Sequence, residues 1–283
     1  MGKRIVHSLA RAAFVVLLTI TWVAGASAQV IEIDTCQTLA TFGATYKLTD
    51  VVFACGDCLI VAANRITIDL RGFPIVQDIG CFDGAAITDG GVARTLTTIK
   101  NGATFSDDIG SFDYGLDMRA SSRTEVLVFD TIFNNIDGIA VGDRALVRDC
   151  LSIGNRKRGI RGGDFVQVQL TGTFLNGLGG GSDGGGVRVG DHCLVTVNAA
   201  ESNAGDGIFT GAFCTVSHNE VRDNDRGIAV EGIKSLVTHN ATNDNTNEGL
   251  VVQCPGTVTN NSSARNGENY VFEGPGCVTK NNN

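Results

Sequence analysis

Four side chains hold the same place in short glycine-led segments and could together recognise an acidic sugar. Each one follows a glycine and then an aliphatic residue: Asp117, Arg161, Arg188 and Phe209. A guanidinium group binds a carboxylate through two parallel hydrogen bonds, and a carboxylate such as Asp117 can accept a proton during catalysis. The alternative is an ordinary solvated strand face that carries two arginines. In either case, the four residues can act together only if the fold stacks their segments.

An asparagine recurs through the second half of the chain and predicts such a stack. The gaps between successive members are 20, 21, 27, 21, 21 and 21 residues. A repeat near 21 residues is too short for a pair of helices and fits one coil of a β-solenoid. The members are Asn135, Asn155, Asn176, Asn203, Asn224, Asn245 and Asn266.

Stacked coils place equivalent residues about 4.8 Å apart, which is the usual spacing of paired strands. One coil cannot bury its own apolar side, whereas a stack of coils forms a continuous interior. At a tight turn we expect the asparagine to take the left-handed conformation and its amide to bond to the turn or to the next asparagine. On the outer side we expect Asp117, Ala140, Arg161, Arg188 and Phe209 to form one column, in that order.

Several segments resemble the repeat of the right-handed parallel β-helix proteins of the pectin-lyase-like superfamily. The pattern is Gly-Ile-x-Val, then Val-x-x-Asn, then Asn, and Asn64–Phe73 and Thr98–Gly102 resemble early coils. The resemblance covers roughly residues 46–283 and implies an all-β fold, a single-stranded right-handed parallel β-helix (β-solenoid) with an N-terminal cap. That superfamily holds lyases, hydrolases, epimerases and non-enzymatic binding proteins, so the resemblance leaves the activity open.

The segment Tyr114-Gly-Leu-Asp117 resembles the start of a motif in alginate epimerases. The family pattern continues with Pro-His, but Met118 and Arg119 follow here. The missing histidine is one of the residues expected to handle protons. The same segment also falls where the repeat predicts a turn and the start of a strand.

The first 28 residues are typical of a secretory signal peptide. Lys3 and Arg4 precede an apolar run over residues 12–24, and small residues end the segment at Ala28. A membrane anchor is the alternative, but the run is short for a bilayer span. We therefore expect no membrane span after signal removal and a secreted, periplasmic or extracellular location. The expected division is 1–28 signal peptide, 29–64 N-terminal cap and 65–283 parallel β-helix.

Nine cysteines all follow the predicted signal peptide, and an odd number leaves one unpaired or paired between molecules. The four nearest the N-terminus allow three pairings, which the sequence does not separate: Cys36, Cys55, Cys58 and Cys81. Structural pairing is favoured over a redox role for the Cys55-Gly-Asp-Cys58 motif. Cys193 and Cys214 fall at equivalent positions of neighbouring coils. They could form a disulfide or remain two buried thiols. Cys254 and Cys277 are about one coil apart.

The chain is acidic, which argues against a nucleic-acid partner. Its formal net charge is −8, and removal of three basic residues and no acidic ones with the signal peptide leaves 19 − 30 = −11. This charge also opposes binding of a polyuronate, although Arg156, Lys157 and Arg158 make the surroundings of Arg161 locally basic.

Metal sites receive little support from the sequence. His218 and His239 occupy equivalent positions, but no third ligand shares their column, so we expect no metal. Asp143, Asp164 and Asp191 form a carboxylate row that either shapes turns or binds Ca²⁺ weakly. The glycine-rich insertion at 177–186 is expected to be flexible rather than ligand-binding. No other cofactor is expected.

Two functions follow from these observations. The first is a secreted β-helix repeat protein that binds a polysaccharide or cell-surface glycan along one face without catalysis. The second is a polysaccharide lyase or C5-epimerase that acts on uronic-acid-containing glycans through Asp117, Arg161 and Arg188. No complete set of acid and base residues can be found, so the catalytic residues are unknown and the first function is favoured. We expect a monomer, or an end-to-end oligomer through an exposed end coil.

Overall fold

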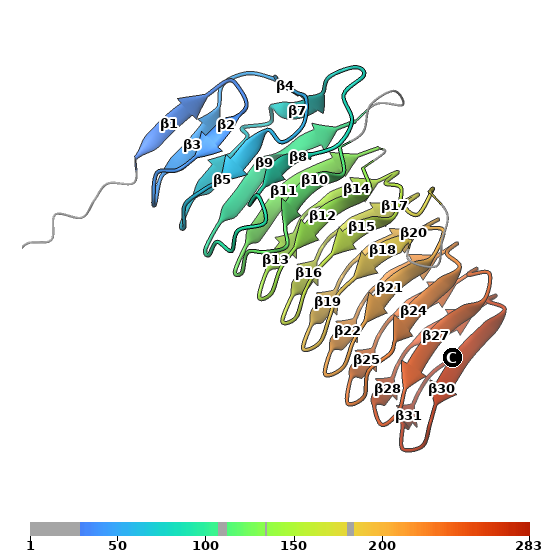
Figure 1. Cartoon of the computed structure of the whole chain (residues 1–283). Coiled ribbons are helices and arrows are strands. Elements are labelled where there is room, and N and C mark those ends of the chain that lie inside the picture. Colours follow the sequence, from blue (N-terminus) through green and yellow to red (C-terminus); the bar gives the residue numbers. More distant parts are fainter. Residues whose placement is uncertain (1–28, 107–111, 134, 180–183) are drawn as a thin grey trace, which may run out of the picture.

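The structure is a computed structural model that describes residues 29–106, 112–133, 135–179 and 184–283. The predicted signal peptide lies outside these residues. The described chain winds into an elongated stack of coils whose strands all run parallel to their neighbours (Figure 1). No helix occurs in this described part, and none of it could therefore cross a bilayer as a helix. The predicted all-β, right-handed parallel β-helix is confirmed.

Each coil contributes one strand to sheet B and strands to two rows of sheet A. Sheet B contains β2 (Gln37–Leu39), β5 (Leu59–Val61), β8 (Ala85–Thr88), β10 (Tyr114–Met118), β12 (Asp137–Val141), β15 (Arg158–Arg161), β18 (Gly185–Arg188), β21 (Asp206–Thr210), β24 (Arg226–Val230), β27 (Glu248–Gln253) and β30 (Glu268–Glu273). The first row of sheet A contains β1 (Val30–Ile33), β3 (Thr45–Leu48), β6 (Thr67–Asp69), β9 (Thr98–Phe105), β11 (Glu125–Ile132), β13 (Leu146–Arg148), β16 (Gln167–Gln169), β19 (Leu194–Thr196), β22 (Thr215–Ser217), β25 (Leu236–Thr238), β28 (Thr257–Thr259) and β31 (Val278–Lys280). The second row contains the ends of β9 and β11 with β4 (Val52–Ala54), β7 (Pro74–Gln77), β14 (Leu151–Ile153), β17 (Gly172–Phe174), β20 (Ala199–Glu201), β23 (Glu220–Arg222), β26 (Ala241–Asn243) and β29 (Ser262–Ala264).

The asparagine ladder holds successive coils together inside the stack. The Nδ2 of each member donates to the Oδ1 of the next, for example Asn155 to Asn176 at 2.8 Å and Asn203 to Asn224 at 2.9 Å. The backbone amide donates to the same oxygen, from Asn155 to Asn176 at 3.1 Å. The predicted amide ladder is therefore confirmed. A second ladder runs through Asn198, Asn219, Asn240, Asn261 and Asn282.

The prediction that these asparagines are left-handed is wrong. The left-handed residue is instead the one directly before the asparagine, such as Leu175 with φ 55° and Asp223 with φ 56°. That residue points into solvent, so many residue types occupy the position. The asparagine side chain points inward instead, because its amide must bond to the asparagine of the next coil.

Close approach to this ladder explains the glycine of each Gly-aliphatic pair. A Cβ on Gly159 would lie 2.8 Å from the Nδ2 of Asn176, and one on Gly207 would lie 2.8 Å from the Nδ2 of Asn224. Only glycine leaves room for the amide there. The aliphatic residue that follows is buried, as Ile160 and Ile208 are, and it forms the core of the stack.

Parallel pairing begins at the start of the described chain. We expected residues 29–64 to lie outside the repeat register, with coils starting near Ile66, but β1 pairs with β3 and β2 pairs with β5. The coil register thus starts at Val30. The capping role of residues 29–64 stays a prediction.

Four disulfides connect neighbouring coils, and they resolve the alternatives that the sequence left open. Cys36 is bonded to Cys58 and Cys55 to Cys81, so the two cysteines of the Cys55-Gly-Asp-Cys58 motif have different partners. The other two bonds join Cys193 to Cys214 and Cys254 to Cys277. All nine cysteines lie in the described part of the chain, and Cys150 is the one without a disulfide partner.

Candidate functional site

The outer face of sheet B carries the four predicted site residues in one column. The register pairs Arg161 with Arg188 and Arg188 with Phe209, so these three side chains lie on the consecutive strands β15, β18 and β21. Asp117 on β10 pairs with Ala140, which in turn pairs with Arg161. Asp117 therefore lies two coils, about 10 Å, from Arg161. The structure brings the arginines and the phenylalanine together and leaves the carboxylate apart from them.

Arg188 and Phe209 form the tightest contact of this column. The guanidinium carbon of Arg188 lies 3.9 Å from the ring centroid of Phe209, which is the geometry of a cation–π pair. Both side chains are partly exposed. The ring fixes the position of the guanidinium, whose N–H groups point along its own plane and stay available to an anion.

Arg161 is the second arginine of the column. Its side chain is 43% exposed, and its Nη1 lies 3.9 Å from the buried carboxylate of Asp137. This contact is too long for a hydrogen bond. Arg161 can therefore turn toward a ligand without losing a strong partner.

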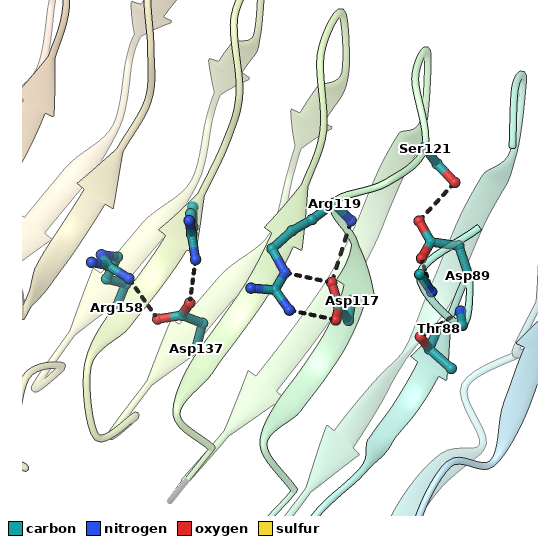
Figure 2. Close-up of polar contacts among 10 residues, drawn as sticks. Thr88, Asp89, Asp117, Arg119, Ser121, Asp137 and Arg158 are labelled. Carbon is teal, nitrogen blue, oxygen red and sulfur yellow. Dashed lines mark hydrogen bonds and ion pairs between the residues drawn. The ribbon is translucent and has the colours of Figure 1, made fainter. Parts of the chain in front are cut away.

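Asp117 is occupied by a neighbour from its own coil. The Nε and Nη2 of Arg119 donate to its Oδ1 and Oδ2, each at 2.8 Å, as Figure 2 shows. These hydrogen bonds raise the pKa of Arg119, whose guanidinium also lies 4.2 Å from the ring centroid of Tyr114. Both oxygens of Asp117 are thus engaged. Arg119 stands two residues after Asp117, where the epimerase-like motif has its histidine.

A second outer column was missed in the sequence. It consists of the residue immediately before the glycine of each Gly-aliphatic pair, namely Tyr114, Asp137, Arg158, Gly185, Asp206, Arg226 and Glu248. Alignment of the glycines would have shown that its charges come in Asp-Arg pairs on adjacent coils. The signal is weak by itself, since a residue next to a glycine usually belongs to a turn.

Two Asp-Arg pairs of this second column neutralise each other's charge. The carboxylate of Asp137, only 2% exposed, lies 3.5 Å from Nη1 of Arg158 (Figure 2). It also lies 3.9 Å from Nη1 of Arg161. Asp206 accepts two hydrogen bonds from Arg226, at 2.5 and 2.9 Å, and they raise the pKa of that arginine. Their carboxylates are therefore committed to ion pairs.

Gly185 interrupts the second column and leaves a hollow in the face. Arg158 and Asp206 lie on its two sides in the column, and Arg188 and Phe209 line it from the first column. Its volume of about 10 Å³ accommodates one water-sized polar group.

The aspartate row has a structural role that explains its spacing. The Oδ1 of Asp143 accepts the backbone N–H of Asp164 at 2.9 Å, and that of Asp164 accepts the N–H of Asp191 at 2.8 Å. Each carboxylate thereby joins its turn to the next one. Within the described residues, no three His, Cys, Asp or Glu side chains converge as ligands of one metal would.

His218 and His239 stack on each other rather than converging on one point. Their ring centroids are 4.9 Å apart and the planes are nearly parallel, at 1°. The Nδ1 of His239 also contacts the Oγ1 of Thr238 at 2.8 Å. Part of the glycine-rich insertion, residues 180–183, lies outside the described residues, so its expected flexibility stays a prediction.

Comparison with known proteins gives the fold. No family model matches the chain, and no curated protein matches its sequence. The solved structure of the Dettilon tailspike protein (gp208) is similar with a TM-score of 0.62 at 12% identity, over 85% of this chain and 55% of that one. This chain thus spans just over half of the tailspike's length.

A second similar structure is the A-module of the mannuronan C-5 epimerase AlgE4 from Azotobacter vinelandii. Its TM-score is 0.50 at 11% identity, over 86% of this chain and 90% of that one. The pectate lyase Pel9A is more distant, with a TM-score of 0.46 at 14% identity, over 86% of this chain and 68% of that one. At identities this low, the first two similarities show the fold alone: the chain is a right-handed parallel β-helix.

Proposed function

We propose that this protein is exported and binds an acidic polysaccharide or cell-surface glycan along the outer face of sheet B, without turning it over. The observation that carries the proposal is the run Arg161, Arg188 and Phe209 on three consecutive coils. Their spacing of about 4.8 Å per coil is close to the length of a sugar residue, so one glycan chain laid along the column would meet successive side chains.

Preorganisation favours binding at this column. Arg188 is already held 3.9 Å from the ring of Phe209, so little side-chain freedom is lost when it meets a carboxylate. The hollow at Gly185 lies directly beside Arg188 and fits a hydroxyl or one carboxylate oxygen. The chain is negatively charged overall and repels an acidic glycan at long range. Binding therefore requires carboxylates that come into direct contact with Arg161 and Arg188.

Export is supported by the four disulfides, because such bonds persist in oxidising compartments. Together with the predicted signal peptide they favour a periplasmic or extracellular location.

The carboxylates nearest the two arginines argue against catalysis there. Removal of a sugar ring proton needs a base that can turn toward that proton and come within hydrogen-bond reach of it. Asp117 has both oxygens bonded to Arg119, and Asp206 has both bonded to Arg226. Asp137 is buried against two arginines. Arg119 also stays protonated at any physiological pH, so it cannot replace the missing histidine as a base.

The test is a glycan array probed with the purified protein, followed by incubation with each bound polysaccharide. We expect binding to uronate-containing glycans, with no unsaturated uronide released and no change in the proportion of C5 epimers. The double variant R161A/R188A should lose this binding. The variant R222A, which removes an exposed arginine of sheet A, should keep it.

The alternative is a polysaccharide lyase or epimerase, which the segment Tyr114-Gly-Leu-Asp117 favours because Tyr114 and Asp117 are both partly exposed on β10 of sheet B. Release of unsaturated uronides or epimerised product, lost in R161A, would establish the enzyme and refute the binding-only proposal.

A further inference from the structure

A second surface, on the second row of sheet A, is apolar and lies away from the site. Its central column runs through paired outward positions of six consecutive coils: Phe53, Val76, Phe105, Ile132, Ile153 and Phe174. Phe53 is 66% exposed, and the other five are partly exposed. Beyond Phe174 the column becomes polar, with Glu201 and Arg222 paired at 2.8 Å. We name the six residues the apolar column.

The surface around the apolar column is also poor in charge. The neighbouring outward column contains Ala103, Asp130, Leu151 and Gly172, and the adjacent corner exposes Val128 and Leu170. Burial raises the pKa of Asp130, the carboxyl group of this neighbouring column. Contiguous apolar patches of this kind are rare on monomeric soluble proteins and mark interaction sites.

Some side chains of this surface lie flat over glycines of the sheet. A Cβ on Gly172 would lie 2.5 Å from Cε2 of Phe174 and 3.0 Å from Cδ1 of Leu151, so both side chains cover the glycine. On the next corner, the ring of Phe133 covers Gly154 in the same way. A flat face of paired strands suits another flat face better than it suits a flexible peptide.

The order of residues along the apolar column indicates what covers it. An isologous contact requires a surface that matches itself after a two-fold rotation. If the axis crosses the column between Phe105 and Ile132, Phe105 meets Ile132 of the other copy and Val76 meets Ile153. Phe53 then meets Phe174. Each residue of the apolar column thus faces a residue of comparable size in the other copy. Asp130 faces the small Ala103 of the other copy rather than a second carboxylate.

The same rotation pairs opposite charges at one corner. Arg71 and Asn101 share a corner, since both are left-handed and the N–H of Gly72 donates to the carbonyl of Asn101. Asp149 lies at the same corner, in the coil of Ile153, whereas Arg71 lies in the coil of Val76. The two residues are therefore equally far from the axis, on opposite sides of it. The side chains of Arg71 and Asp149 are 41% and 45% exposed. Within the chain Arg71 lies 3.6 Å from Glu32 and Asp149 lies 3.2 Å from Arg148, so a contact between copies would extend these two ion pairs. The axis generates this pair twice in each dimer.

We propose that a second copy of this chain docks on the apolar column, with the two β-helices antiparallel and related by a two-fold axis between Phe105 and Ile132. The contact joins the second rows of sheet A and leaves both sheet B faces free. It is independent of the proposed glycan binding, and it differs from the end-to-end association expected from the sequence.

Sedimentation of the purified protein over a concentration series tests the proposal. We expect the mass to rise from monomer to dimer, and the variant F105D to weaken the association at least hundredfold. L236D, which places the same charge on an outward, 39% exposed position of β25, should associate like the wild-type protein. A wild-type monomer throughout, or association that F105D leaves unchanged, would overturn the proposal.

Charge reversal tests the orientation. R71E and D149R should each weaken the dimer about tenfold, since each reversal places like charges together at two symmetric points. The combination R71E/D149R should restore the association to within about threefold of the wild-type value. Additive weakening in the double variant would exclude this axis. Circular dichroism of each variant controls for folding.

Discussion

Arg188 and Phe209 are 21 residues apart in sequence and adjacent in the register of β18 and β21, with the guanidinium carbon 3.9 Å from the ring centroid. The contact exists because one coil of the β-helix takes about 21 residues here. The same geometry sets Arg161 one coil before Arg188. The recognition surface is thus a direct product of the repeat.

The asparagine ladder should contribute strongly to stability. The variant N203A removes the acceptor of the backbone N–H and the Nδ2 of Asn176, and it removes the donor to the carbonyl oxygen of Thr173. We expect the free energy of unfolding to fall by roughly 2–4 kcal/mol, because buried polar groups then lose their hydrogen bonds. Urea denaturation of N203A beside N243A, which changes an outward asparagine of β26, measures the difference. Equal losses in the two variants would show that the ladder has no special role.

The glycine before each inward aliphatic residue should be required for packing. In G207A the new methyl group would lie 2.4 Å from Cγ1 of Val221 and 2.8 Å from Nδ2 of Asn224. Overpacking of this kind costs about 1–3 kcal/mol and lowers the melting temperature. G256A is the control, since its methyl group would meet nothing closer than 3.2 Å. A melting temperature of G207A equal to that of the control would contradict the packing explanation.

Cys150 should be chemically silent in the folded protein. Burial raises the pKa of its thiol to about 12, so almost no thiolate forms at pH 8. Iodoacetamide should label no cysteine of the native protein and one per chain in denaturant without reductant. Mass spectrometry of the peptides would identify that residue and the four disulfides. Labelling of Cys150 within minutes in the native state would contradict its buried position.

Stability should depend on the ionisation of Asp130. Burial raises the pKa of this carboxyl group above its ordinary value of 3.8, so the folded state binds the proton more tightly than the unfolded state. Its contribution is therefore favourable at low pH and is lost as the pH rises through the raised pKa. We expect D130N to become more stable relative to the wild-type protein from about pH 4 to pH 7, with a plateau above the raised pKa. A difference that stays constant over this range, measured by urea denaturation, would contradict the shift.

The repeat predicted most of the fold because its restrictions act inside the stack. An inward position must hold an aliphatic residue or a ladder amide, as Ile160 and Asn176 do, and these residues recur at a fixed spacing. The outward column of Asp117, Arg161, Arg188 and Phe209 followed from the same register. The repeat did not predict the contacts of Asp117. Its pairing with Arg119 depends on the conformation of the Arg119 side chain, which folds back over its own strand.

Other features left no repeated signal. The left-handed corners face solvent, so residues as different as Leu175, Ser202 and Asp223 serve equally well. The N-terminal disulfides join irregular coils, with separations of 22 residues for Cys36–Cys58 and 26 for Cys55–Cys81. Local spacing could not choose between their pairings. The Asp-Arg pairs of the second column were hidden because neighbouring coils carry opposite charges.

Titration calorimetry of a uronic-acid oligosaccharide from the array tests the central claim most directly, with R188A and R222A compared with the wild-type protein. Loss of the charged hydrogen bonds of Arg188 should weaken binding by about 10–100-fold, whereas R222A should bind as tightly as the wild-type protein. Unchanged affinity in R188A, or an equal loss in both variants, would contradict the assignment of the glycan to the outer face of sheet B.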